Sequence, residues 1–431
     1  MIYRREHGRP VSCVSRSTFR TRRKRLLAGL ASVAGALTIL PSAAAIAVTT
    51  ASGTSDWAVV PAQPPAGSFS SYSFGSTSCV KASDCFSAGT GVTSTRVEHV
   101  FVEHWNGKAW SAMGLPSFGQ AAAEATTCLS EADCWVVGAR FSNGYPTHAI
   151  VLHWNGKAWS ISPSPSIKTD SALNGIACYS SGCVSVGVEC VAAAQCFSAG
   201  GAIWTAAVRP LVENWNGKAW AVSKAIQPRG SFAANLDEVR CTGASHCVSI
   251  GLEATGLEAP TIGFSEIWNG RAWKVEVLPV PPEIDHYPNS VGLNDIACPT
   301  ASDCVAVGGA TPRSSGLSLP TPLIEKWNGS KWAIAMTRST SGPLTLEDLS
   351  CLSSSRCAVV GFADGYIEPS NAAAAVWNGS TLTLGKVAEG KLTDTELLTV
   401  GCAGANTCVA LGYGKSGSKL MLLGEESTLP K

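Results

Sequence analysis

The sequence has little charge, little histidine and no sustained helical periodicity. Charged residues make up 15% of the 431 positions and only seven residues are histidine, so a histidine-based catalytic triad has few candidate members. Apolar residues do not recur at helical spacing over any long stretch, which argues against an α-helical fold. After residue 47 no apolar run reaches the length of a membrane span, so we expect that part of the chain to be soluble.

The first 47 residues differ in composition from the rest. Nine Lys or Arg residues and one acid, Glu6, precede an uncharged run from Leu26 to Ala47. A basic segment, an apolar segment and the small-residue site Ala45-Ile46-Ala47 predict an export signal over residues 1–47. A retained membrane anchor is the alternative, although its Gly, Ser and Pro residues would make it a weak spanning helix.

Removing this leader changes the charge balance. The whole chain has 32 basic and 31 acidic residues, whereas 23 and 30 remain after residue 47, which gives a net charge of −7. Because such a chain has no basic footprint, we expect neither a nucleic-acid partner nor contact with a membrane after cleavage. We expect residues 48–431 to form one secreted, monomeric domain.

The cysteines also indicate a secreted protein. Cys13 lies in the leader, and the other sixteen cysteines form eight local pairs: Cys79/Cys85, Cys128/Cys134, Cys178/Cys183, Cys190/Cys196, Cys241/Cys247, Cys298/Cys304, Cys351/Cys357 and Cys402/Cys408. An even number of cysteines behind an export signal predicts disulfides, and a zinc site would need C-x2-C spacing and convergent histidines, which are missing. The pairing among the four crowded cysteines of the third repeat stays open.

A tryptophan motif returns at intervals of about fifty residues, a period typical of a propeller or another repeat array. Its copies are Trp105–Trp110, Trp154–Trp159, Trp215–Trp220, Trp268–Trp273, Trp327–Trp332 and the incomplete Trp377–Ser380. Together with the cysteine pairs they define seven repeats, which begin near residues 68, 120, 171, 231, 290, 342 and 392.

Each repeat reads as four short strands. Apolar, β-branched runs of five or six residues are bounded by turn formers, and Asn-Gly within the motif predicts a two-residue type I′ hairpin. That turn would pair Trp105 with Lys108 and Glu103 with Trp110, so both indoles would lie on one sheet face as diagonal neighbours. We interpret the paired rings as packing between blades; a solvent-facing ladder for stacking sugars is the alternative.

The last repeat lacks a fourth strand, and the beginning of the domain supplies a spare one. The seventh repeat stops after its third strand without an Asn-Gly turn, whereas residues 55–61 resemble a fourth strand that carries Trp57. We therefore predict an all-β, seven-bladed β-propeller of four-stranded antiparallel blades, with hairpin disulfides and with the N-terminal strand completing the last blade.

These features resemble the kelch-type propeller of the galactose oxidase central domain. Gly200-Gly201 and Gly308-Gly309 keep the double glycine of that family. The spacings C-x5-C-x-x-x-G and W-N-G-x-x-W also resemble a group of secreted bacterial repeat proteins. The resemblance implies fold and no chemistry, because a copper oxidase would need a Cys-linked Tyr and His ligands, and neither a sialidase box nor a G-x-S-x-G elbow is present.

Loops after the second and fourth strands vary most between repeats, so we place the candidate ligand site on the face that carries them. The candidate residues are Tyr145, His148, Trp204, Arg209, Tyr366 and Tyr413. An ordinary role as solvated loop residues is the alternative for each of them.

Three successive blades place a carboxylate three residues before their first cysteine, at Glu238, Asp295 and Asp348. If these side chains point into the central channel, they could hold Ca²⁺, which prefers oxygen ligands, or act as an acid/base pair. The alternative is that they bond to neighbouring backbone and water. No other cofactor is expected.

A second set of acids recurs two residues before the first Trp of the motif, at Glu103, Glu213, Glu266 and Glu325. Repetition in four blades indicates a structural role, because a catalytic residue is usually singular. In the predicted register each one faces the second Trp and could accept its indole N–H.

From sequence the best-supported function is a secreted module that binds an extracellular or cell-envelope carbohydrate or protein. One alternative is a polysaccharide hydrolase or lyase that uses the channel carboxylates. The other is a structural envelope protein, so the sequence leaves enzymatic activity undecided and leans against it.

Overall fold

The structure, a computed structural model, describes residues 56–142, 145–165, 170–190, 198–199, 203–204, 208–256, 259, 261–282, 290–311, 321–337, 344–363 and 370–430, without the side chains of 142, 145, 146, 190, 198, 199, 203, 204, 290 and 311. Every regular element in these ranges is a β-strand. The described part of the chain contains no helix with the length and apolar character needed to cross a membrane.

The strands form seven antiparallel sheets of four strands each, together with one two-stranded hairpin. Blades one to three consist of β2 (Ser71–Lys81), β3 (Asp84–Val92), β4 (Glu98–Trp105) and β5 (Trp110–Ala112); β6 (Ala121–Ser130), β7 (Asp133–Ser142), β8 (Tyr145–Trp154) and β9 (Trp159–Ser162); and β10 (Ser171–Tyr179), β11 (Gly182–Cys190), β14 (Val208–Trp215) and β15 (Trp220–Ser223). The extra hairpin, β12 (Ser198–Ala199) with β13 (Ile203–Trp204), interrupts blade three.

The other four blades repeat this order. They consist of β16 (Ala233–Gly243), β17 (His246–Ala254), β18 (Thr261–Trp268) and β19 (Trp273–Val277); β20 (Ser290–Thr300), β21 (Asp303–Thr311), β22 (Thr321–Trp327) and β23 (Trp332–Met336); β24 (Leu344–Ser353), β25 (Arg356–Ala363), β26 (Asn371–Trp377) and β27 (Leu382–Leu384); and β28 (Thr393–Ala403), β29 (Thr407–Ser416), β30 (Lys419–Thr428) and β1 (Ala58–Val60).

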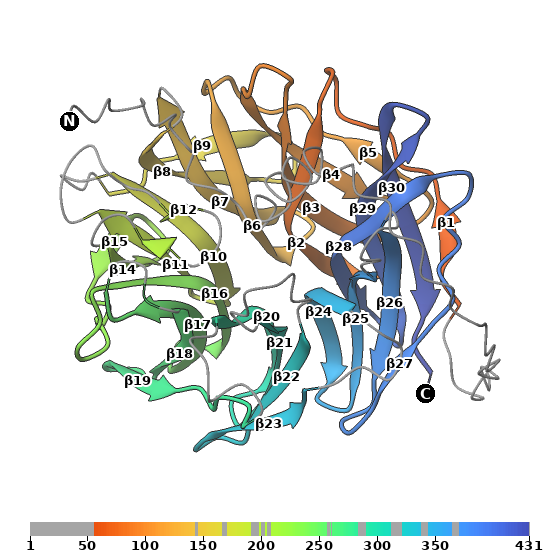
Figure 1. The fold of residues 1–431 in the computed structure, drawn as a ribbon. Coiled ribbons are helices and arrows are strands. Elements are labelled where there is room, and N and C mark those ends of the chain that lie inside the picture. Colours follow the sequence, from red (N-terminus) through yellow and green to blue (C-terminus); the bar gives the residue numbers. More distant parts are fainter. Residues whose placement is uncertain are drawn as a thin grey trace, which may run out of the picture.

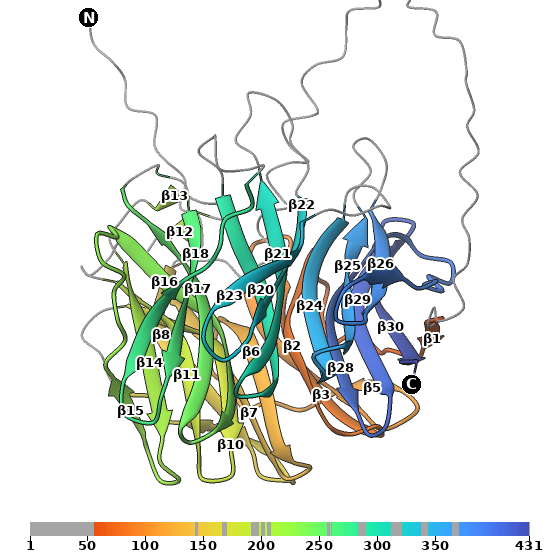
Figure 2. The ribbon, with the colours of Figure 1, turned by 90° about the horizontal axis from the view of Figure 1, so that it is seen from below.

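The first strands of the blades surround the central axis, and each contacts the first strands of both neighbouring blades (Figure 1). Within a blade, the turn between the first and second strands and the turn between the third and fourth strands lie on the same side, because alternate strands run in the same direction. We call this side the turn face. Figure 2 shows the blades running between this face and the opposite one.

The N-terminal strand closes the ring, as the sequence predicts. β1 pairs antiparallel with β30, with Val59 opposite Glu425. Just before it, the Trp57 backbone N–H donates to Lys386 O over 2.8 Å, and the indole is 2% exposed in the core between blades six and seven. The last blade is therefore built from both ends of the domain.

The predicted register of the tryptophan hairpin is wrong by two residues. Trp105 lies directly opposite Trp110, so the loop has four residues and not two. The Asn106 side chain accepts the backbone N–H groups of Lys108 and Ala109 at 3.0 Å each, and only Gly107 has a positive φ, +87°. A type I′ turn needs a positive φ at both central residues; here the Asn side chain forms the turn instead.

The tryptophan pairs pack between blades, which confirms that part of the prediction. Trp105 and Trp110 are both fully buried with ring centroids 5.7 Å apart, and they share a core with Val409 and Leu422 of blade seven. Since each pair lies against the preceding blade, burial of these large rings supplies much of the apolar contact that holds the ring together.

Seven of the predicted disulfides lie within first hairpins. The paired cysteines stand directly opposite or nearly opposite each other, with Cα atoms 3.9 to 4.0 Å apart: Cys79–Cys85, Cys128–Cys134, Cys178–Cys183, Cys241–Cys247, Cys298–Cys304, Cys351–Cys357 and Cys402–Cys408. The predicted Cys190/Cys196 pair falls outside the described residues, because Cys196 is not among them.

The glycine four residues after the second cysteine accommodates a bulge in the first strand. In blade six the register shifts between Leu346 and Asp348, and this shift brings Thr345 O against the Cα of Gly361. A Cβ at Gly361 would lie 1.9 Å from that oxygen. The motif C-x-x-x-G is therefore a requirement of the bulge.

We expect Gly361→Ala to lower the free energy of unfolding by about 3 kcal/mol, because β24 would have to move away from the added methyl group. Equilibrium urea unfolding measures the change. Gly114→Ala is the matched control, since a Cβ there meets nothing within 4 Å and should change stability by less than about 0.5 kcal/mol. Equal stability of the two variants would contradict this account of the motif.

Candidate functional site

The three predicted channel carboxylates come together on the inner strands of blades four, five and six. Glu238 and Asp295 are fully buried and Asp348 is 2% exposed. Each follows a register shift in its strand, at β16, β20 and β24 respectively. The bulge thus places all three side chains at the same level of the ring.

Arg240 joins two of these carboxylates. Its Nη1 donates to Glu238 Oε1 and, over 2.9 Å, to Val239 O. Its Nη2 donates to Asp295 Oδ1 over 2.9 Å. The guanidinium therefore bridges blades four and five inside the channel, with 27% of its side chain exposed.

The carboxylates also hold neighbouring blades together. Asp295 Oδ2 accepts the Leu349 N–H over 3.1 Å, and Asp348 Oδ2 accepts the Val400 N–H over 2.9 Å. In blade one, Ser76 Oγ accepts the Thr126 N–H over 2.8 Å. In every case the acceptor stands three residues before a cysteine, and the donor stands two residues before the cysteine of the next blade.

We name this contact the interblade latch. Blade seven uses a variant of it, because Thr399 Oγ1 donates to Thr77 Oγ1 of blade one over 3.0 Å. The alternative in which the channel acids bond to neighbouring backbone is therefore confirmed for Asp295 and Asp348. Their occurrence in successive blades has a structural cause.

Asp348 retains a proton more strongly than an ordinary carboxyl. Burial raises its pKa well above the usual value, and the charge of Asp295 and a hydrogen bond shared with Asp295 raise it further, while the bonds to Thr399 and the Val400 N–H lower it. Burial lowers the pKa of Arg240, but the nearby carboxylates of Glu238 and Asp295 raise it more, so this side chain stays charged. The cluster thus holds one fixed cation beside a buried acid, Asp348, whose pKa is raised.

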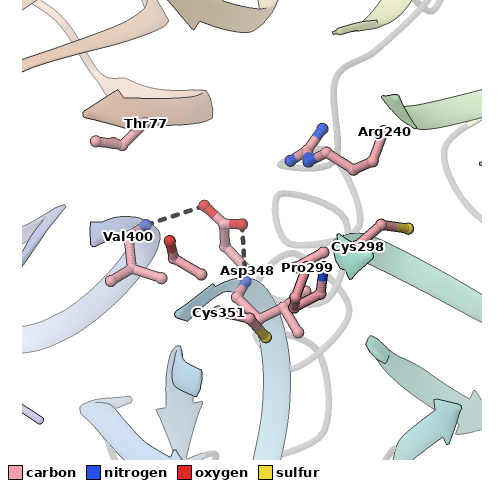
Figure 3. A pocket seen from close by; sticks show the side chains of 10 residues that line it. Thr77, Arg240, Cys298, Pro299, Asp348, Cys351 and Val400 are labelled. Atoms are coloured by element: carbon pink, nitrogen blue, oxygen red, sulfur yellow. Dashed lines mark hydrogen bonds between the residues drawn. The ribbon is translucent and has the colours of Figure 1, made fainter. Parts of the chain in front are cut away.

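A cavity of about 220 Å³ lies against this cluster and is bordered by Thr77, Arg240, Ser350 and Asp348. Figure 3 shows Asp348 beside Val400, with Thr77 and Arg240 on other sides of the space. Cys298 and Cys351 also line it, which places it toward the turn-face end of the channel. The cavity has room for a small polar group.

The calcium prediction remains a prediction. Among the residues that the structure describes, no group of three His, Cys, Asp or Glu side chains is arranged to hold a metal ion. A Ca²⁺ ion near Asp295 would also compete with the Arg240 guanidinium for the same oxygen.

The repeated glutamates lie in the blade cores and do not face the second Trp. Glu103 is opposite Ala112, so the predicted hydrogen bond to Trp110 is wrong, for the same reason as the hairpin register. Glu213 instead accepts Ser164 Oγ over 2.9 Å, and Glu266 accepts the Ile226 N–H over 3.1 Å. Burial raises the pKa of Glu103 to about 8 and of Glu213 to about 7.

The candidate loop residues are distributed over several blades. His148 is exposed opposite Arg140, and Arg209 is exposed opposite Glu189. Tyr413 is half-buried and packs beside the core between blades seven and one. Tyr145 and Trp204 are described only as backbone and Tyr366 lies outside the described residues, so their ligand role remains a prediction.

Sequence reasoning missed Arg240. The residue before the first cysteine is small in the other six blades: Ser78, Thr127, Ala177, Ala297, Ser350 and Gly401. A long cationic side chain at that one position, two residues after Glu238, is the signal that could have identified it.

The comparisons with known proteins concern the fold. No family model and no curated protein matches the sequence. The polysaccharide lyase Uly1 is similar in structure, with a TM-score of 0.52 and 8% identity over 87% of this chain and 97% of that one. YCF48 from Cyanidioschyzon merolae gives 0.48 at 13% identity over 85% and 98%. The PL25 ulvan lyase bound to a saccharide gives 0.46 at 10% identity over 86% and 94%. At these identities the likeness shows a propeller fold and nothing about activity.

Proposed function

We propose that the chain is an exported β-propeller that binds an extracellular or cell-envelope ligand, carbohydrate or protein, without turning it over. The observation that carries the proposal is that the channel acids already form hydrogen bonds and ion pairs within the ring. Asp295 and Asp348 accept backbone N–H groups of the next blade, and Arg240 pairs with Glu238 and Asp295. Groups held in this way maintain a rigid ring, and a rigid ring is a suitable scaffold for a binding surface.

Export is supported by the composition of residues 1–47 and by the seven disulfides, since disulfides persist in oxidising compartments. The kelch-type resemblance belongs to the same proposal. Gly308-Gly309 within β21 supports it.

A second candidate is a polysaccharide hydrolase or lyase, because one observation favours it. Asp348 borders the channel cavity, has a raised pKa and is hydrogen-bonded to Asp295. A buried acid with a raised pKa beside a second carboxyl group can supply an acid and a base. Both acids are nearly inaccessible, and their oxygens already accept backbone hydrogen bonds, so we rank this candidate second.

The test is to incubate the mature protein with insoluble cell-wall and plant polysaccharides, with and without a chelator, and to measure both retained protein and released sugar. We expect saturable retention without release. Asp348→Asn should retain the ligand within about twofold of the wild type, because an amide is close in shape to the neutral acid and still accepts the Val400 N–H.

Sugar release that disappears in Asp348→Asn would overturn the binding proposal in favour of the enzyme. No saturable retention of any polysaccharide or envelope protein would favour the structural role. Retention that disappears with chelator and returns with added Ca²⁺ would support the metal prediction together with binding.

A further inference from the structure

A second cavity, of about 320 Å³, lies between blades two and three on the turn face, away from the channel. Asp133, Trp135 and His153 line it from blade two, and Ser180, Ser181 and Trp215 line it from blade three. Trp135 is one of two tryptophans that belong to neither the repeated motif nor the closing strand. The lining of this cavity therefore includes a large side chain that does not repeat around the ring.

Three side chains of blade two form a rigid wall. Trp135 and His153 are direct cross-strand partners, and their rings stack with centroids 4.0 Å apart and planes at 22°. Asp133 Oδ1 accepts Trp135 Nε1 over 2.8 Å and contacts His153 Nε2 over 3.0 Å. Because Asp133 contacts Nε2 of His153, the other ring nitrogen, Nδ1, points away from Asp133. The Asp133 side chain is 39% exposed and the His153 side chain is 31% exposed.

The opposite wall carries the Trp215 indole, which lacks the acceptor present in three other blades. Trp327 and Trp377 of blades five and six lack an acceptor among the described residues as well, but both are buried. In blades one, two and four the first Trp of the motif donates over 3.0 Å to a carbonyl in the first hairpin, namely Ala82, Glu131 and Ala244. The first hairpin of blade three is one residue shorter, since Cys178 and Cys183 are five positions apart. Trp215 Nε1 has no acceptor among the described residues, and its side chain is only partly buried.

Blade two differs from the other blades at the residue that follows the second cysteine, which forms part of this wall. Where blade two has Trp135, the other blades have Phe86, Val184, Val248, Val305, Ala358 and Val409. Blade one has the same Asp–His contact, Asp84 Oδ1 to His104 Nε2 over 2.8 Å, but it has phenylalanine in place of the Trp. Blade one therefore offers a matched control.

We infer that the cavity between blades two and three binds one uncharged pyranose ring, an inference that rests on the proposed binding function. The half-buried Trp215 presents an aromatic surface to the apolar face of a sugar. The Trp215 N–H, the Asp133 carboxylate, His153 Nδ1 and the hydroxyls of Ser180 and Ser181 supply donors and acceptors for its hydroxyl groups.

Size and charge narrow the ligand further. The volume lies at the lower end of the range of about 300 to 1,000 Å³ that is typical of small-molecule sites, which suits a single ring. Among the described ion pairs Asp133 contacts His153 but no Lys or Arg, so its carboxylate disfavours an acidic sugar. A neutral hexose or N-acetylated hexosamine at a chain end fits both limits.

The experiment titrates the full mature protein with the methyl glycosides of glucose, galactose, mannose and N-acetylglucosamine, followed by tryptophan fluorescence and calorimetry. We expect saturable binding of at least one glycoside. His153→Asn should weaken it at least about tenfold through loss of ring contact and a hydrogen bond. Blade three carries Asn214 at the same position, so the fold accommodates this change.

Ser181→Leu provides a second variant that fills the cavity from an exposed turn residue and should also reduce affinity at least about tenfold. His104→Asn, the equivalent change in blade one, should leave affinity within about twofold of the wild type. Thermal unfolding of each variant confirms that the fold is intact.

Equal affinity in wild type, His153→Asn and Ser181→Leu would overturn the site while leaving the binding function in place. Binding of a protein ligand but of no glycoside would do the same. Absence of any saturable ligand in both this titration and the polysaccharide assay would overturn the binding function together with the site.

Discussion

Raising the pH from 5 to 9 should strongly destabilise this protein. Five glutamates are fully buried at equivalent positions on the third strands: Glu103, Glu213, Glu266, Glu325 and Glu425. Burial raises their pKa values from the usual 4.5 to about 7 for Glu213 and Glu266 and to about 8 for the other three. In the folded protein these side chains are therefore neutral at pH 5.

The direction of the pH effect follows from the shift. Because the folded pKa lies above the unfolded one, the stabilisation is fully present below about pH 4.5 and is lost as the pH rises through 7 and 8. At 1.36 kcal/mol per pKa unit, each glutamate loses about 3 to 5 kcal/mol by pH 9. We expect the unfolding temperature, measured by scanning calorimetry, to fall by roughly 15 °C or more between pH 5 and pH 9.

Glu325→Gln isolates one of these groups. Neither Glu325 oxygen has a hydrogen-bond partner in the described part of the chain, so an amide should be tolerated at low pH and should be more stable than the wild type by about 3 kcal/mol at pH 9. Glu131→Gln, an exposed glutamate that pairs with Lys81, should leave the pH slope unchanged. A flat wild-type profile, or one unaltered by Glu325→Gln, would show that these acids ionise freely.

Trp57→Ala should lower the free energy of unfolding by about 4 kcal/mol and loosen the closure of the ring. Its indole is 2% exposed and packs with Ala374, Leu397 and Leu423 of blades six and seven, so truncation leaves a large cavity. The same change should speed amide hydrogen exchange along β30, whose outer edge β1 covers. Urea unfolding and exchange measured by mass spectrometry report the two effects.

Val59→Ala is the control within the same strand. Val59 is 50% exposed, so its truncation should cost less than about 0.5 kcal/mol. If Trp57→Ala were as stable as Val59→Ala, the N-terminal strand would not be the element that closes the ring.

The interblade latch gives the channel acids Asp295 and Asp348 a structural role. Ser76 serves one latch with a hydroxyl, and Asp295 and Asp348 serve two others with carboxylates. A hydroxyl and two carboxylates accept the equivalent backbone N–H from the next blade. The bulge therefore requires an acceptor at this position of the strand, and it does not require an acid. Asp348 also hydrogen-bonds Asp295 and has a raised pKa, which makes it the member of the cluster with potential for acid–base chemistry.

The fold was predictable because its sequence signals lie on neighbouring strands. Cysteines six positions apart, Asn-Gly turns and paired tryptophans each report on neighbouring strands, and their repetition set the number of blades. The hairpin register was not predictable in this way, since it depended on whether the Asn106 backbone or its side chain formed the turn. Glu425 was missed among the buried acids because the last blade lacks the Trp motif that marked the other four.

The sequence by itself determined a ring of seven blades with hairpin disulfides, closed by a strand containing Trp57. Those features depend on residues close together in the chain or on a simple count of repeats. Only the tertiary structure decided which side chains meet across blades. Arg240 reaches Asp295 and Trp215 reaches Trp135 although these partners are far apart in sequence, and such contacts depend on how the blades pack. The repeating residues hold the ring together, and the candidate sites lie where neighbouring blades carry side chains that do not repeat.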